Sequence, residues 1–85
     1  MYLIAQSQRD SRAALKDAES GLKLDSNHGH SLWSKAQALR LLGRACEALP
    51  ILDRVREIAP KNITKENLQK EISLCQESIV EDLMN

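Results

Sequence analysis

Aromatic residues are almost absent from this chain of 85 residues, which contains one Trp, one Tyr and no Phe. Proteins that bind single-stranded nucleic acid by base stacking need several rings, and this chain lacks such a platform. An excess of charge is lacking too, because twelve basic residues balance twelve acidic ones. No long-range attraction therefore draws the chain to nucleic acid or to an anionic membrane surface. We expect no nucleic-acid or membrane partner.

Long apolar runs are also missing. The longest, such as the run over residues 45–52, are interrupted by Glu47 and Pro50, whereas a helix needs about 20 apolar residues to cross a bilayer. The first five residues are apolar, but they have neither the basic start nor the longer apolar core of a secretory signal. We expect no membrane-spanning segment and a reducing, cytoplasmic environment.

Cysteine and histidine are too few and too scattered for a metal or redox site. Cys46 and Cys75 have no CxxC spacing and no neighbouring pair of histidines, so we expect both thiols to be buried as small hydrophobic side chains. His28 and His30, two residues apart, cannot face one metal ion from a helix. The chain also lacks a glycine-rich phosphate loop and any grouping of a nucleophile with a base. We predict no cofactor and no enzymatic activity.

What the chain does contain is an internal repeat. The dipeptide Ala14-Leu15 recurs as Ala48-Leu49, and the offset of about 34 residues also relates further positions. These are Ala5 with Leu39, Ala18 with Leu52, Leu24 with Ile58 and Ser26 with Pro60. Such a period is typical of stacked helix-turn-helix hairpins, in which each unit buries its apolar face against its neighbours. Stacks of this kind usually present a surface to a partner.

Apolar residues at steps of three and four predict four main helical segments. They cover residues 11–24, 30–42, 45–58 and 64–84. Ser11 and Thr64 can cap the first and last of these segments, and Gly43 can end the second in a left-handed conformation. Pro60 follows the third segment as a stop. Pro50 lies early in that segment, so we expect a modest kink and no break.

Residues 29–62 resemble a tetratricopeptide repeat. The matching positions are Leu32, Ala36, Leu39, Leu42-Gly43-Arg44, Ala48-Leu49, Leu52 and Pro60. In that family small residues, here Ala36 and Ala48, let the two helices of a hairpin approach closely. The usual Tyr and Phe are replaced by Leu39 and Leu52. The resemblance implies an all-α fold, an antiparallel helix-hairpin solenoid of about five helices that ends in a long capping helix.

The same resemblance divides the single domain 1–85 into a shortened repeat over 1–28, a full repeat over 29–62 and a capping helix over 63–85. The first unit is matched less fully, through Ala5, Ala14-Leu15, Ala18, Gly21 and Ser26. Glu66 and Lys70 depart from the pattern of a third repeat, as in a cap. About three repeats are normally needed for stability. We therefore expect the chain to belong to a larger array or to associate through its open first unit.

The family's binding groove is lined by the first helix of each hairpin. By position, the resemblance places Leu3, Gln6, His30, Trp33, Ser34, Gln37 and Arg40 in that groove. Helical periodicity agrees in part, because His30, Ser34, Gln37 and Arg40 share a polar stripe with Trp33 at its border. The indole of Trp33 is either an anchor for a partner or packed beneath the preceding repeat. Periodicity leaves both open.

Residues 29–36 further resemble the last repeat of co-chaperones that clamp the acidic tail of heat-shock chaperones. The Lys and Arg of that clamp correspond to His30 and Ser34, neither of which is a permanent cation. Each lost charge-assisted contact removes about 1.5–3 kcal/mol. Lys35 and Arg40 remain as cations nearby, so weak binding of an acidic peptide stays open.

We interpret the chain as a protein-protein interaction module, a scaffold or co-chaperone-like adaptor that holds a peptide or helix of a partner in a concave groove. The alternative is a structural role, in which the apolar residues 1–4 drive self-association or docking on a longer protein. A helix-turn-helix nucleic-acid binder is disfavoured, because no Arg- and Lys-rich recognition helix is present.

Overall fold

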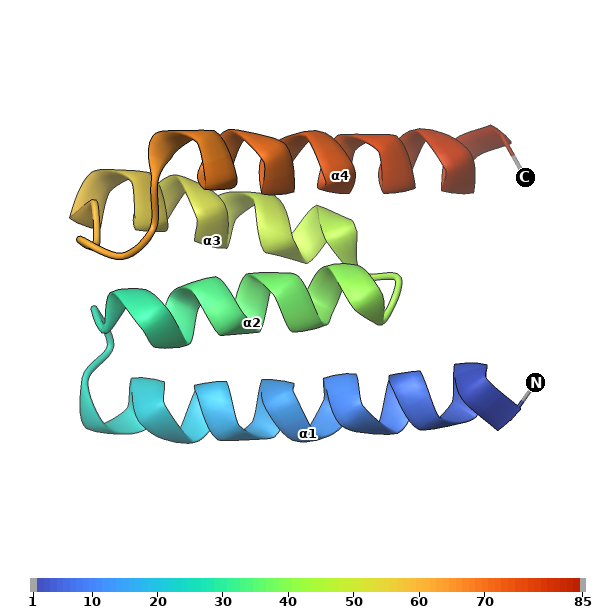
Figure 1. Cartoon of the computed structure of the whole chain (residues 1–85), viewed down its shortest axis with the longest axis horizontal. Helices are drawn as coiled ribbons and strands as arrows, with labels where there is room; N and C mark the ends of the chain where they lie inside the picture. Colours follow the sequence, from blue (N-terminus) through green and yellow to red (C-terminus); the bar gives the residue numbers. More distant parts are fainter. Residues whose placement is uncertain (1, 85) are drawn as a thin grey trace.

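The computed structural model describes the backbone of residues 2–84 and the side chains of residues 10–81, 83 and 84. Within that range the chain forms four α-helices and no strand. They are α1 (Tyr2–Leu24), α2 (Gly29–Leu41), α3 (Ala45–Ile58) and α4 (Lys65–Met84). Figure 1 shows them side by side in chain order. The expected all-α fold class is confirmed.

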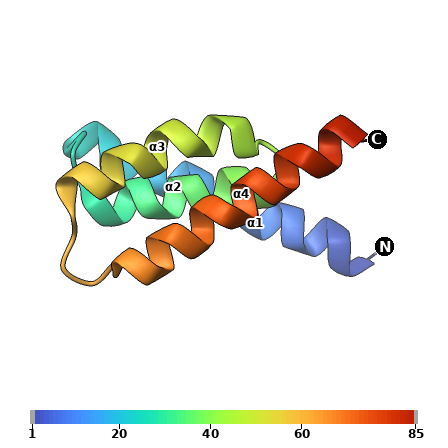
Figure 2. The ribbon, with the colours of Figure 1, turned by 90° about the horizontal axis from the view of Figure 1, so that it is seen from above.

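Each helix packs on the next one along the chain. Contacts join α1 to α2, α2 to α3 and α3 to α4, and a short contact also joins α2 to α4. Seen from the α4 side, α4 runs obliquely across α2 (Figure 2). In both views the last turns of α4 extend past α3, and the first turns of α1 extend past α2 (Figures 1 and 2). The described helices therefore form a stack with two projecting helix ends.

The first helix differs from the expectation. A helix from Ser11, preceded by the remnant of another, was predicted, whereas α1 runs unbroken from Tyr2 to Leu24. Ser11 is consequently an interior residue of α1 with a buried side chain, and it does not cap a helix. The physical reason is local, since residues 2–10 contain no Gly, Pro or Asn that would favour a turn. The described chain has four helices where about five were expected.

The other helix boundaries follow local capping chemistry. After α2, Gly43 adopts φ 79°, its N–H donates to the carbonyl of Arg40, and the N–H of Arg44 donates to that of Leu39. These two bonds form a Schellman motif, which confirms the predicted left-handed stop. Thr64 Oγ1 accepts the N–H of Asn67 at 3.1 Å and caps α4 as predicted.

The third helix continues through its proline. Pro50 lies inside α3, which spans the predicted residues. The helix ends at Ile58, and its C-cap Ala59 is a non-glycine residue in the left-handed conformation with φ 49°. The N–H of Ala59 donates to the carbonyl of Val55 at 2.8 Å, and Pro60 follows. A residue with a Cβ is strained in this conformation.

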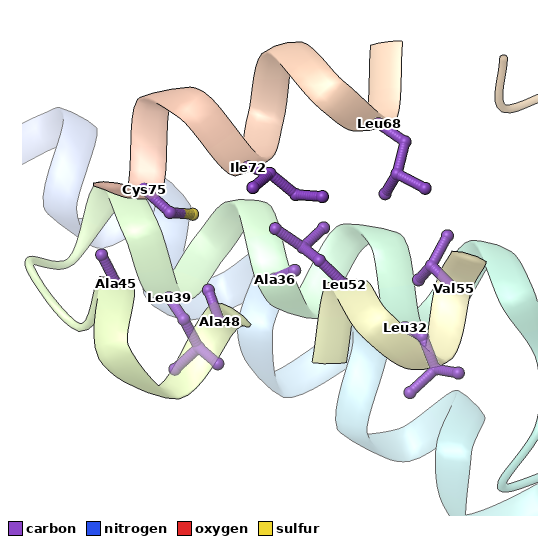
Figure 3. Close-up of a cluster of buried hydrophobic side chains, with 10 residues drawn as sticks. All are labelled: Leu32, Ala36, Leu39, Ala45, Ala48, Leu52, Val55, Leu68, Ile72 and Cys75. Carbon is purple, nitrogen blue, oxygen red and sulfur yellow. The ribbon is translucent and has the colours of Figure 1, made fainter. Parts of the chain in front are cut away.

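The hydrophobic core lies between α2, α3 and α4 (Figure 3). Its buried members are Leu32, Ala36, Leu39, Ala45, Ala48, Leu52, Val55, Leu68, Ile72 and Cys75. Ala36 and Ala48 are fully buried, and residues this small let neighbouring helices approach closely. Cys75 is buried as expected, but the prediction for Cys46 is wrong, because its side chain is exposed. Cys46 lies one position beyond Ala45, off the inward stripe of α3.

The first helix contributes less to the core. Ala18 is buried, and Leu15 and Leu22 pack against the core from its edge. Ala14 is exposed, although Ala48, 34 residues later, is fully buried. The difference arises because α1 has only α2 as a neighbour among the described helices. No helix in residues 2–84 has both the length and the apolar character needed to span a membrane.

Candidate functional site

The predicted groove residues of α2 lie along one side of that helix. His30 and Ser34 are exposed, whereas Trp33, Gln37 and Arg40 are half-buried. Helical spacing places Trp33, Gln37 and Leu41 on one ridge, because they are four residues apart. Leu41 is 54% exposed although it is apolar. Periodicity had not identified Leu41 as a candidate, and only its exposure shows that it belongs to this surface.

Two predicted site residues cannot be placed in the same way. Leu3 and Gln6 belong to the first turns of α1, but their side chains lie outside the described residues. Their backbone is part of the same continuous helix as residues 11–24. The first turns of α1 lie toward the end of the stack where α2 ends, at the opposite end from His30 (Figure 1).

Trp33 has two environments at once. Its side chain packs against the core cluster, yet part of it remains accessible. Trp33 therefore has features of both interpretations: one part of the ring packs in the fold, and another part is available to a partner. A partly exposed indole held in place by the core is a rigid contact surface with little conformational entropy left to lose.

Arg40 is paired inside the protein and is not a free cation. Its Nε donates to Oε1 of Glu71 at 2.9 Å, which ties α2 to α4. The side chain of Arg40 is 22% exposed and that of Glu71 only 5%. A buried carboxylate needs such a partner, because an isolated charge is costly to remove from water. Sequence reasoning missed Glu71, although a charged residue beside the apolar stripe of α4 was a usable signal.

The thiol of Cys75 lies near this ion pair. Burial raises its pKa, the carboxylate of Glu71 raises the pKa further, and the guanidinium of Arg40 partly opposes both effects. The thiol therefore stays protonated at neutral pH and is a poor nucleophile. Cys75 therefore serves as a packed core side chain, and no group near it among the described residues favours the thiolate enough to activate it.

The two histidines are next to each other at the start of α2. The N–H of Ser31 donates to Nδ1 of His28 at 3.2 Å, and Ser31 Oγ lies 2.7 Å from the same nitrogen. His28 is thus the N-cap of α2. The rings of His28 and His30 have centroids 6.2 Å apart. No group of three metal-ligating side chains exists among the residues that the structure describes.

Two crevices lie away from the predicted site. An apolar crevice of about 420 Å³ separates the end of α3 from the start of α4. Its walls include Val55, Ile63, Leu68 and Ile72. A second crevice, of about 540 Å³, lies between α1 and the turn that joins α2 to α3. Neither contains any predicted groove residue whose side chain the structure describes, so the exposed side of α2 is a ridge and not part of either pocket.

No protein-family model, curated protein or solved structure matches the chain. The geometry of the described residues is therefore the basis for a functional proposal. Among the described residues that geometry offers no activated nucleophile, and on α2 it offers an exposed ridge with apolar and polar side chains.

Proposed function

We propose that this chain is a protein-protein interaction module with a tetratricopeptide-like arrangement, in which α2 and α3 form the complete hairpin and α4 the cap. The packing of helices in chain order supports this arrangement. The repeat offset of 34 residues supports it too, since Ser11 and Ala45 are both buried, as are Ala18 and Leu52. On the outer side of α4, Glu66 and Lys70 are exposed, as suits a helix that closes a stack.

The binding surface that we propose is the ridge of Trp33, Gln37 and Leu41, flanked by His30 and Ser34. The observation that carries this proposal is the 54% exposure of Leu41 on the same ridge as the partly exposed Trp33. Exposed apolar side chains beside polar ones are typical of surfaces that contact another protein. A partner peptide or helix could bury both apolar side chains and hydrogen-bond to the amide of Gln37.

A clamp for an acidic tail is the less favoured mode of binding. Arg40, the cation expected to serve it, is engaged by Glu71. Ser34 is uncharged, and Lys35, the other nearby cation, is two positions from Trp33 and so lies off the ridge. We therefore propose that apolar contact and neutral hydrogen bonds recognise the partner, so that a heat-shock chaperone tail is not the favoured ligand.

An isotope-edited NMR titration with two peptides tests this function. One probe is an acidic peptide with a free carboxyl terminus, and the other is a neutral helical peptide with an apolar face. We expect the second to shift the Trp33 indole, the Gln37 amide and the Leu41 methyl signals in a saturable way. Shifts there with the acidic peptide alone would overturn the proposed mode, and no shifts with either would overturn the site.

A matched pair of leucine substitutions distinguishes specific binding at the ridge from nonspecific apolar association. Leu41→Gln and Leu24→Gln both remove an exposed leucine, at 54% and 92% exposure. We expect Leu41→Gln to weaken binding of the helical peptide about tenfold, the effect of losing about 1.4 kcal/mol of contact energy. Leu24→Gln should leave binding unchanged. Equal effects of both substitutions would contradict a site on α2.

A structural role is the second candidate function. On α1, Ala14 and the 92%-exposed Leu24 leave apolar surface uncovered, and another part of a larger protein could cover it. The apolar residues 1–4 that were expected to drive this docking lie outside the described side chains. If this structural role holds, Leu24→Gln should weaken docking on α1. A reducing, cytoplasmic setting suits either role, because Cys46 is an exposed free thiol.

A further inference from the structure

The crevice between α1 and the α2–α3 turn is strongly cationic although the chain is neutral overall. Its lining comprises Arg12, Leu15, Lys16, Glu19, Ser20, Lys23, Leu42 and Arg44. Four of these residues are cations and one is an acid. Arg44 already pairs with Glu47 at 2.6 Å. Arg12, Lys16 and Lys23 have no carboxylate partner among the described side chains.

The opposite charge is concentrated at the far end of α4. No Lys or Arg occurs among residues 72–85, whereas three acidic residues do. Glu77 and Glu81 are exposed, one helical turn apart, and neither has a cationic partner among the described side chains. Val80 between them is half-exposed, and Met84 is largely exposed. These turns belong to the part of α4 that projects beyond α3 (Figures 1 and 2).

The two surfaces match in spacing and in composition. Arg12 and Lys16 are four residues apart on α1, as Glu77 and Glu81 are on α4, so each pair covers one helical turn. The crevice has apolar side chains in Leu15 and Leu42, and the α4 end offers Val80. Among the residues that the structure describes, α1 and α4 of one molecule make no contact. Surfaces that are complementary but separated in this way meet only between two molecules.

We propose that the acidic end of α4 in one molecule docks into the cationic crevice of a second copy of this chain. Glu77 and Glu81 face Arg12 and Lys16, and Val80 covers the apolar floor. Because the two surfaces are different, the contact is heterologous, and each molecule keeps one free crevice and one free helix end. Association is weak and sensitive to salt, since exposed ion pairs are screened by ions.

Sedimentation velocity over a range of protein concentrations tests the contact. The comparison uses salt at about 0.01 M and about 1 M, where the screening length is about 30 Å and about 3 Å. We expect the average mass to rise with protein concentration at low salt and to stay that of a monomer at high salt. A monomer under both conditions would overturn the proposal. Association that persists at high salt would overturn it as well, because it would indicate an apolar contact.

Charge-reversal variants identify the two surfaces. Lys16→Glu and Glu77→Lys change exposed residues and should each abolish association at low salt. Lys61→Glu and Glu57→Lys make the same charge changes at other exposed positions. They should change the association constant by no more than about twofold, since screened surface charges act locally. If the control variants reduced association equally, net charge and not the proposed contact would be responsible.

Mixing the two inactive variants gives the decisive result. Lys16→Glu retains an intact α4 end, and Glu77→Lys retains an intact crevice, so an equimolar mixture should form a dimer. A mixture that stays monomeric would overturn the proposal.

Discussion

The ion pair between Arg40 and Glu71 predicts an unequal response to the loss of its two partners. Glu71 is almost completely buried, whereas Arg40 retains 22% exposure. Removing Arg40 leaves a buried carboxylate without a partner, which costs about 3–5 kcal/mol in buried pairs. Removing the charge of Glu71 leaves a guanidinium that still reaches water. The free energy of unfolding then falls by the contribution of one hydrogen bond between charged groups, about 1.5–3 kcal/mol.

The experiment is a double-mutant cycle in urea, followed by circular dichroism, with Arg40→Met, Glu71→Gln and the combined variant. We expect Arg40→Met to lower the free energy of unfolding more than Glu71→Gln does. A second double variant, Arg40→Met with Glu71→Leu, replaces the pair by apolar side chains and should be more stable than Arg40→Met alone. A domain of 85 residues has a total stability of roughly 4–13 kcal/mol, so these losses are readily measured.

The pair of Arg44 and Glu47 is the matched control. Its atoms are just as close, with Nε and Oε2 at 2.6 Å, but both side chains are about half exposed. Solvent screening should make its coupling energy much smaller than that of Arg40 and Glu71. Equal coupling in the two pairs would refute the argument from burial. So would a larger loss of stability in Glu71→Gln than in Arg40→Met.

Three further predictions concern the core and the helix ends. Ala59→Gly should raise stability by about 0.5–1 kcal/mol in thermal melts by relieving the left-handed strain at φ 49°; a lower melting temperature would contradict it. Ala48→Leu should overpack the core and cost about 1–3 kcal/mol, while Ala14→Leu, at the equivalent exposed position, should be tolerated. Equal melting temperatures of the two variants would refute this packing argument. Because the pKa of Cys75 is raised, the unfolded thiol ionises first, so stability should hold below the ordinary pKa of 9.0 and fall as the pH rises above it. The urea midpoint from pH 7 to 10 measures this effect, and Cys75→Ala should show a smaller decrease.

Local chemistry made most of the helix boundaries predictable from the sequence. Gly43 and Thr64 act through backbone groups within three residues of themselves, and both do what the sequence indicated. The bounds of α3 were also correct, including its passage through Pro50. Such signals are complete in the sequence because the interacting groups are near neighbours.

The error at α1 came from giving the repeat period priority over local propensity. Extending the period backward required a hairpin turn before Ser11, but residues 2–10 contain no Gly, Pro or Asn. The continuous helix that results leaves the first unit with a single helix and exposes Ala14. A periodic pattern therefore identified which positions correspond, but it did not determine whether a turn forms between them.

The candidate site was predictable only in part for a different reason. The polar stripe of His30, Ser34 and Gln37 follows from helical spacing, and the structure leaves His30 and Ser34 exposed. The state of Arg40 depends on Glu71, a residue 31 positions away on another helix. No periodicity within α2 reports such a contact. The exposure of Leu41 likewise depends on which neighbouring helices fail to cover it.

The repeat period relates the pair α1 and α2 to the pair α3 and α4. The first pair is closely packed and the second leaves a crevice, and one side chain accounts for part of this difference. Gly21 on α1 lets α2 approach so closely that a Cβ at this position would lie 2.5 Å from Ser31 Oγ. The corresponding residue on α3 is Val55, whose side chain lines the apolar crevice of about 420 Å³ beside α4. The connection over residues 59–64 is also longer than that over residues 25–28. An apolar ligand that enters between two helices should therefore do so between α3 and α4, where the larger side chain and the longer connection hold the helices apart.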